Sequence, residues 1–126
     1  MAYLERWQKI MPQQKSKFLQ VFERDQGRCV YCGRDLKADY DTFMMAEEDH
    51  LVPGSKNGYK RELDNLVLCC SVCNRLKANF EPVPPIDVKK ERRRYITAVR
   101  AYIMARRGER IKEFLQVTHP TILDYQ

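Results

Sequence analysis

The sequence has no long hydrophobic run. None of the apolar stretches in its 126 residues approaches the ~18 residues that a membrane-spanning helix needs. The first residues, from Met1 to Trp7, also lack the apolar segment at the centre of a secretory signal peptide. We therefore expect a cytoplasmic protein without a membrane partner.

Internal repeats, low-complexity tracts and the polar bias of disordered chains are absent as well. Hydrophobic residues make up 44% of the chain and charged residues 32%, which is ordinary for a globular protein. A length of 126 residues leaves room for little more than one domain. The sequence therefore predicts a single domain over residues 1–126.

A disulfide framework is not expected, because the number of cysteines is five, which is odd, and no signal peptide precedes them. Four of the cysteines form two pairs at the same short spacing, Cys29-x-x-Cys32 and Cys70-x-x-Cys73. Such a spacing lets both sulfurs of a pair face one point, and two pairs supply four thiolates to a tetrahedral Zn²⁺. Because sulfur fills all four positions, this zinc is expected to be structural. The fifth cysteine, Cys69, is expected to be a small buried hydrophobic residue.

Positive charge exceeds negative charge, with 23 Lys and Arg against 17 Asp and Glu. The excess is concentrated in residues 88–112, which hold 10 basic and 2 acidic side chains. Such a segment fits the surface of a polyanion. For the charge run alone, a solvated helix face is the favoured interpretation, and the polyanion-binding surface stays open as the alternative.

The hydrophobic pattern predicts an α+β fold. Gly27 is expected to end a helix, Asn74 to cap the start of another, and Gly108 to interrupt a third. Four apolar residues of the third helix, Tyr95, Val99, Tyr102 and Ile103, are expected to form a buried stripe. The expected elements are helices over 3–11 and 13–25, strands over 42–49 and 66–68, a helix from residue 74, a break at 81–85, and helices over 86–107 and onward to 115.

Polar residues gather between and beside the two cysteine pairs. A histidine, His50, directly follows Asp49, and the amides Asn65 and Asn74 come later. A neutral imidazole can take a proton from water, and carboxylate and amide oxygens suit a hard cation such as Mg²⁺. Together these groups suffice for metal-assisted phosphodiester cleavage. A lone histidine is more often an ordinary surface or hydrogen-bonded residue.

In this order and spacing, the polar residues and the second cysteine pair resemble the HNH endonuclease family. The first cysteine pair, followed by Gly33, resembles the zinc-stapled members of that family. The resemblance covers residues 17–80. Its motifs are Asp49-His50-Leu-Val-Pro, Asn65-Leu-Val-Leu, and Cys70-x-x-Cys73-Asn74-x-x-Lys77.

The resemblance implies a ββα-metal core, in which a hairpin and a helix hold one catalytic divalent ion. On this model His50 is the general base, and Asp49 and Asn74 are ligands of the catalytic metal. Asn65 would brace the hairpin loop and orient His50. Asparagine at position 74 replaces the last histidine of the family name, an HNN variant that favours Mg²⁺ or Mn²⁺ at the catalytic site.

Further expectations concern the neighbouring acids, of which Glu48 departs from the family pattern, and the contacts with substrate. Glu47 would contact the metal ligands rather than the metal itself. The Glu48 carboxylate would face solvent or pair with a basic side chain. Arg75 and Lys77 would approach the phosphate backbone of DNA, the expected substrate. The helical additions at 1–25 and 86–115 would grip DNA, the second through Arg92, Arg93 and Arg94.

Two other function classes explain part of the sequence. A non-catalytic zinc-binding module for nucleic acid or protein accounts for the cysteines and the charge, but not for the His and Asn residues at family spacing. A thiol redox protein is disfavoured, because neither cysteine pair lies in a βαβ context. The sequence leaves open whether the protein acts as a homodimer or with a targeting partner protein, and whether it nicks DNA or cuts both strands.

Overall fold

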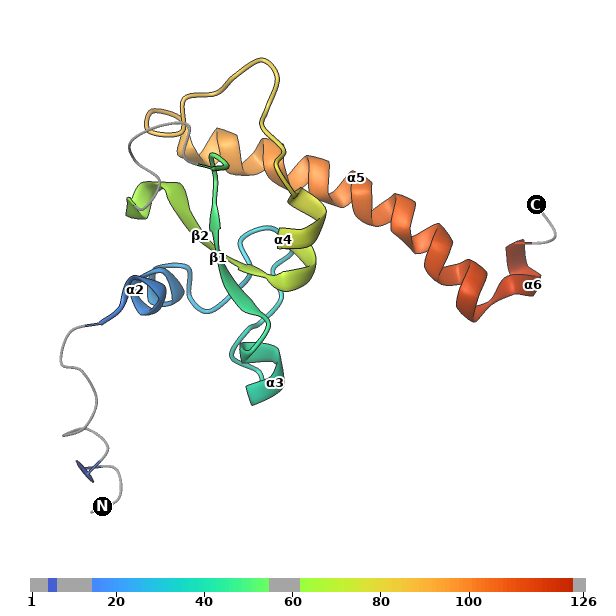
Figure 1. Cartoon of the computed structure of the whole chain (residues 1–126), viewed down its shortest axis with the longest axis horizontal. Coiled ribbons are helices and arrows are strands. Elements are labelled where there is room, and N and C mark those ends of the chain that lie inside the picture. The colour runs from blue at the N-terminus through green and yellow to red at the C-terminus, as the bar shows by residue number, and fades with distance from the viewer. Residues whose placement is uncertain (1–4, 7–14, 55–61, 124–126) are drawn as a thin grey trace.

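The computed structural model describes residues 5–6, 15–54 and 62–123. It is a small α+β fold in which helices surround a two-stranded sheet (Figure 1). Most of the helix expected over 3–11, apart from residues 5–6, and most of the loop after Gly54 lie outside the described residues. The elements are α2 (Lys17–Arg24), α3 (Tyr40–Phe43), β1 (Ala46–His50), η1 (Leu63–Asn65), β2 (Leu66–Cys70), α4 (Ser71–Lys77), α5 (Arg92–Thr118) and α6 (Pro120–Leu123).

The sheet is an antiparallel hairpin at the centre of the molecule. Its register pairs Ala46 with Cys70 and His50 with Leu66. Every residue of β2 is buried, which confirms the buried strand expected at 66–68 and extends it to Cys70. Alternate residues of a strand point to opposite faces, so Glu47 and Asp49 share the face of β1 opposite to that of His50.

The strand expected over 42–49 is wrong in its first half. Residues Tyr40–Phe43 form the short helix α3, and the strand begins at Ala46. The cause is a helix cap, because the Asp39 carboxylate accepts a hydrogen bond from the Thr42 amide at 2.7 Å. After the turn that follows α3, the strand begins four residues later than the hydrophobic pattern predicted.

The start of α4 also differs from the expectation. The helix begins at Ser71 and is capped by Cys70, whose sulfur accepts a hydrogen bond from the Cys73 amide at 3.4 Å. Asn74 therefore lies inside the helix rather than at its cap. Because Asn74 and Lys77 are three residues apart on a helix, they share one face, and both contact β1.

The long helix α5 packs across the sheet and α4 through a buried stripe. Tyr95, Val99 and Ile103 are buried, and Tyr102 stacks on Phe80 with ring centroids 4.0 Å apart, which confirms the predicted core stripe. The helix begins later than expected, at Arg92, and continues through Gly108 without a break. Its C-terminal half extends away from the sheet (Figure 1). Among the described helices, none is both long and apolar enough to cross a membrane.

Candidate functional site

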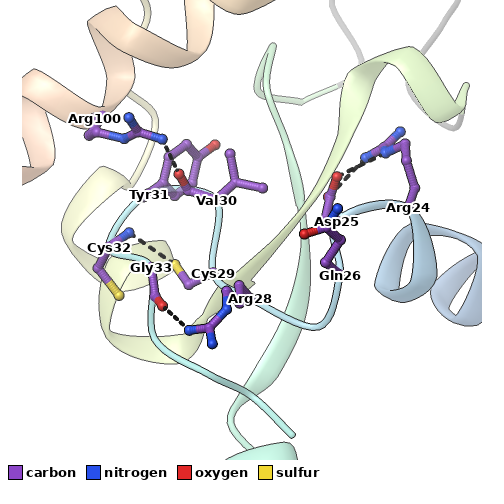
Figure 2. Close-up of a pocket in the computed structure, with 10 residues that line it drawn as sticks. All are labelled: Arg24, Asp25, Gln26, Arg28, Cys29, Val30, Tyr31, Cys32, Gly33 and Arg100. Atoms are coloured by element: carbon purple, nitrogen blue, oxygen red, sulfur yellow. Dashed lines mark hydrogen bonds and ion pairs between the residues drawn. The ribbon is translucent and has the colours of Figure 1, made fainter.

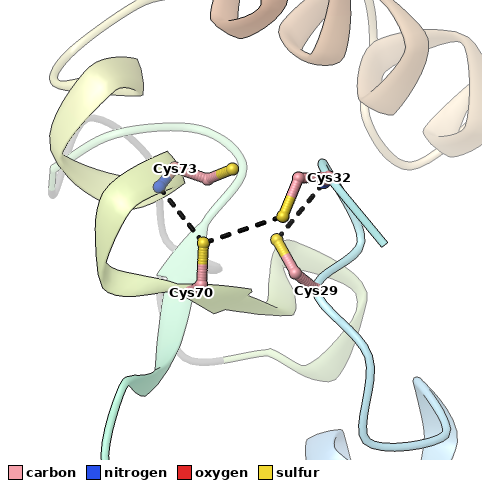
Figure 3. A group of neighbouring side chains, drawn as sticks. All are labelled: Cys29, Cys32, Cys70 and Cys73. Atoms are coloured by element: carbon pink, nitrogen blue, oxygen red, sulfur yellow. Dashed lines mark hydrogen bonds between the residues drawn. The ribbon is translucent and has the colours of Figure 1, made fainter. Parts of the chain in front are cut away.

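The four cysteines of the two pairs converge on one point (Figure 3). Their sulfur atoms all lie within 4.8 Å of one another, and the sulfurs of Cys32 and Cys70 are 3.8 Å apart. Four ligands at the Zn–S bond length of ~2.3 Å form a tetrahedron whose edges are about 3.8 Å. The cluster therefore has dimensions close to those of a four-cysteine zinc site.

Each pair is shaped by its own backbone. In the first, the Gly33 amide donates to the Cys29 carbonyl at 2.8 Å, and Gly33 adopts a positive φ of 80°, a conformation that glycine takes without strain. The Cys32 amide donates to the Cys29 sulfur at 3.4 Å. The second pair spans the junction of β2 and α4, where the Cys70 sulfur caps the helix. Local turns thus aim the sulfurs of each pair toward the cluster.

Three of the four thiols, those of Cys29, Cys70 and Cys73, influence one another strongly. Hydrogen bonds from Cys29 and Cys73 place the pKa of the Cys70 thiol far below its usual range. The interaction with Cys70 raises the pKa of Cys29 to about 11, and interaction with Cys29 and Cys70 raises the pKa of Cys73. Thiols this close share protons, because full ionisation would place four negative charges together. A bound cation is what allows all four to ionise.

Helix α5 holds both cysteine pairs through two arginines. Arg100 donates to the Val30 carbonyl at 2.6 Å, inside the first pair, and Arg107 donates to the Cys73 sulfur at 3.2 Å. Seven residues separate the two arginines, which places them on one helix face two turns apart. Sequence analysis assigned neither contact, although this spacing, in phase with the buried Val99 and Ile103, is a signal that could have suggested a shared face.

A cavity of about 610 Å³ lies beside the first cysteine pair (Figure 2). Its three arginines bind groups of the protein itself. Arg28 donates to the Gly33 carbonyl, Arg24 pairs with Asp25, and Arg100 donates to Val30. The arginines of this cavity therefore already have partners in the protein, and Arg100 joins the cysteine loop to α5.

Asp49 lies in a buried polar cluster between β1 and α4. The Tyr31 hydroxyl donates to one Asp49 oxygen at 2.5 Å, and the Lys77 ammonium lies 3.3 Å from the same oxygen. The side chain of Lys77 is 1% exposed, and its Nζ also donates to the His50 carbonyl at 2.8 Å. Burial raises the pKa of Asp49, and the charge of Lys77 opposes that rise. Lys77, expected to approach phosphate, is instead directed into the protein.

A second carboxylate on the same face of β1 contacts the other polar residue of α4. The Asn74 amide donates to a Glu47 oxygen at 2.5 Å in a half-buried position. Two carboxylates, Glu47 and Asp49, and the Asn74 amide therefore line the β1–α4 junction. Oxygen donors of this kind fit Mg²⁺ or Mn²⁺. Sequence analysis gave Glu47 a role in supporting the metal ligands, and the structure places it in direct contact with Asn74, one of the expected ligands.

Asn65 fixes the chain directly after His50. Its side-chain oxygen accepts from the Val52 amide at 2.9 Å, and its main-chain oxygen accepts from the Leu51 amide at 2.8 Å. The Asn65 side chain is fully buried. The predicted bracing residue thus holds the segment that follows His50, while His50 itself is half-buried at the end of β1.

The predicted DNA-contacting arginines lie in different environments. Arg75 is exposed on α4, and Arg93 is exposed at the start of α5. Arg94 is exposed and pairs with Glu91 at 3.2 Å. Arg92 is half-buried and donates to the carbonyls of Asp64 and Leu66 at 2.9 and 3.1 Å. Its guanidinium thus joins α5 to the start of β2.

We expect Arg92→Gln to lower the free energy of unfolding by about 1–2 kcal/mol, because it removes charged hydrogen bonds to two carbonyls. The neighbouring Arg93→Gln, which removes the same charge from an exposed position, should change it by less than about 0.5 kcal/mol. Urea denaturation of both variants measures the difference. Equal midpoints would show that Arg92 does not fasten the helix.

Residues 29–80 match the family model described as HNH endonuclease. The matched segment contains both cysteine pairs, the β1–β2 hairpin and α4. The family resemblance and the ββα arrangement expected from the sequence are thereby confirmed, and the four-cysteine cluster agrees with the zinc-stapled members. Comparisons with curated proteins and with solved structures found no match.

Proposed function

Residues 29–80 form an HNH endonuclease domain, and from that premise we propose that the chain is a metal-dependent endonuclease that hydrolyses DNA phosphodiester bonds. The observation that carries the proposal is the β1–α4 junction. There two carboxylates and the Asn74 amide lie on adjoining elements. Asp49 directly precedes His50 at the end of β1, and Asn65 fixes the residues that follow.

In this proposal His50 is the general base. An imidazole can accept a proton from water near neutral pH and so generate the attacking hydroxide. Two contacts hold its backbone. Lys77 donates to the His50 carbonyl, and Asn65 binds the amides of Leu51 and Val52. These contacts fix the backbone from which the imidazole projects, which supports a defined position for the base at the end of β1.

Asp49 and Asn74 would hold the catalytic Mg²⁺ or Mn²⁺, with Glu47 beside them. When bound, such a cation neutralises charge on the phosphate and the leaving oxygen. Asn74 can present its amide oxygen to the cation if its side-chain amide turns over, which exchanges the nitrogen now facing Glu47 for the oxygen. Tyr31 and Lys77 orient the Asp49 carboxylate from inside the protein.

The zinc would have a different role. Cys29, Cys32, Cys70 and Cys73 occupy every position of a tetrahedral ion, so no position remains for water. We assign this Zn²⁺ to the fold. It joins the first cysteine loop, which carries Tyr31, to the β2–α4 junction, which leads directly to Asn74.

The test is a cleavage assay on zinc-loaded protein with Mg²⁺ or Mn²⁺. Substrates are supercoiled plasmid, linear duplex, single strand and a four-way junction. His50→Ala should lower the cleavage rate by about 10²–10⁴-fold, the contribution typical of a general base, without changing zinc content or melting temperature. His119→Ala is the matched control, because His119, the second histidine of the chain, is exposed near the C-terminus. This variant should cleave as the parent does.

Two results would contradict the proposal. Equal cleavage by the parent and His50→Ala would remove His50 as the base. Absence of cleavage of every substrate by folded, zinc-loaded protein would favour a non-catalytic binding module. Running the assay over a range of protein concentrations would also reveal a requirement for a homodimer.

A further inference from the structure

A groove with a cavity of about 450 Å³ separates α4 from the second half of α5. This volume is within the ~300–1,000 Å³ typical of small-ligand sites. Four arginines line it: Arg75 from α4, and Arg106, Arg107 and Arg110 from α5. A cavity with four guanidinium groups attracts a polyanion.

Three of these guanidinium groups are held in place. Arg107 donates to the Cys73 sulfur, Arg106 donates to the Tyr102 hydroxyl at 3.1 Å, and Arg110 pairs with Glu113 at 3.1 Å. The Nε atoms of Arg106 and Arg107 are nevertheless buried and have no hydrogen-bond acceptor within the described part of the chain. The donors open to an anionic ligand are instead those of Arg75 and Arg110, which are exposed.

Apolar side chains form the rest of the groove. Ile111 and Phe114 from α5 are 54% and 60% exposed, and Val72 from α4 is 36% exposed. A continuous duplex presents phosphates at its surface and keeps its base faces stacked inside. Unpaired bases, in contrast, expose flat apolar faces that stack on aromatic side chains while arginines track the phosphates. Arginines beside an exposed phenylalanine thus favour a single strand over a duplex.

The groove adjoins the proposed active site through α4. One face of this helix carries Asn74 and Lys77 toward β1, and another carries Val72 and Arg75 toward the groove. An α-helix is ~10–12 Å across with its side chains. A strand that leaves the β1–α4 junction therefore needs to pass only one helix to reach the groove.

We propose that this groove binds an unpaired segment of DNA next to the cleaved bond, so that the preferred substrate contains single-stranded DNA. Phe114 would stack on an unpaired base, and the arginines of the groove would bind the adjacent phosphates. This inference rests on the proposed function for the position of the cut, but binding of a single strand in the groove does not require cleavage.

The test measures binding rather than cleavage. Zinc-loaded His50→Ala protein is titrated into a fluorescent single-stranded oligonucleotide and into a duplex of the same sequence. The double variant His50→Ala with Phe114→Ala should bind the single strand about tenfold more weakly than His50→Ala alone, as expected for one lost base–aromatic stack. Its affinity for the duplex should be unchanged. Val117→Ala is the control, since Val117 is 83% exposed on the same helix and does not line the groove.

A second variant tests the charge. Arg110→Gln should reduce the salt dependence of single-strand binding by about 0.7 in log–log slope, the value for one phosphate contact. Lys112→Gln removes the same charge from an exposed neighbour outside the groove and should change the slope less.

Three results would overturn the inference. They are equal effects of the groove variants and their controls, equal affinity for duplex and single strand, and a dimer in solution that Phe114→Ala dissociates. The last would identify the groove as an interface between copies of the chain. Because cleavage is not read, inactivity of the parent enzyme would contradict the proposed function without affecting this result.

Discussion

Replacing Cys70 with alanine should abolish zinc binding and cooperative folding, whereas replacing its neighbour Cys69 should do neither. Both residues are fully buried in β2, but only Cys70 belongs to the four-sulfur cluster. Structural zinc sites contribute about 10–16 kcal/mol of binding free energy, and small domains are stable by only about 5–15 kcal/mol. Loss of one ligand therefore removes a contribution as large as the whole stability of the fold.

The measurement is zinc per chain, from metal analysis of purified protein, together with a thermal melt followed by circular dichroism. Cys69→Ala should retain one zinc and lose about 1–3 kcal/mol, the usual result of a small core substitution. Burial raises the pKa of Cys69, so this residue remains a neutral thiol. If Cys70→Ala retained its zinc and melted like Cys69→Ala, the four-cysteine assignment would be wrong.

The parts of this site that sequence could predict depend on short spacings. A spacing of two residues between cysteines predicts a tight turn independently of the rest of the chain. A short apolar run such as 66–68 is most simply a buried strand. The role of Asn65 as a brace followed from its place in the family motif. Its hydrogen bonds to Leu51 and Val52 agree with that role.

The parts that sequence could not predict depend on distant contacts. Helix α4 starts at Ser71 because the Cys70 sulfur caps it, which is visible only once the cysteine turn is formed. Helix α5 continues through Gly108 although a glycine costs about 1 kcal/mol there. Arg107, directly before Gly108, is held by the Cys73 sulfur on another element.

The burial of the Lys77 side chain also depends on contacts between distant parts of the chain. Its partner is Asp49, and the Asp49 carboxylate is also held by Tyr31, which lies between the two cysteines of the first pair. No short sequence pattern predicts a contact between three separate elements. The family motif assigned Lys77 to the substrate, but the packing of the cysteine loop against β1 decides where its side chain points.

Asp49→Leu should destabilise the protein by about 3–5 kcal/mol, because it leaves the buried ammonium of Lys77 without a counter-charge. Lys77 is 1% exposed, so water cannot replace the lost carboxylate. The double variant Asp49→Leu with Lys77→Met should recover much of this loss, since two apolar side chains of similar volume can replace a buried ion pair. Urea denaturation of the parent, both single variants and the double variant measures the coupling between the two residues.

The same set of proteins separates stability from catalysis. If Asp49 is a ligand of the catalytic cation, the double variant should regain stability but not Mg²⁺-dependent cleavage, because leucine offers no oxygen donor. A double variant as unstable as Asp49→Leu alone would show that the two charges do not stabilise each other. A stable double variant that cleaves DNA at the parent's rate would instead make Asp49 purely structural, and Glu47 with Asn74 would then be left as the oxygen donors at the β1–α4 junction.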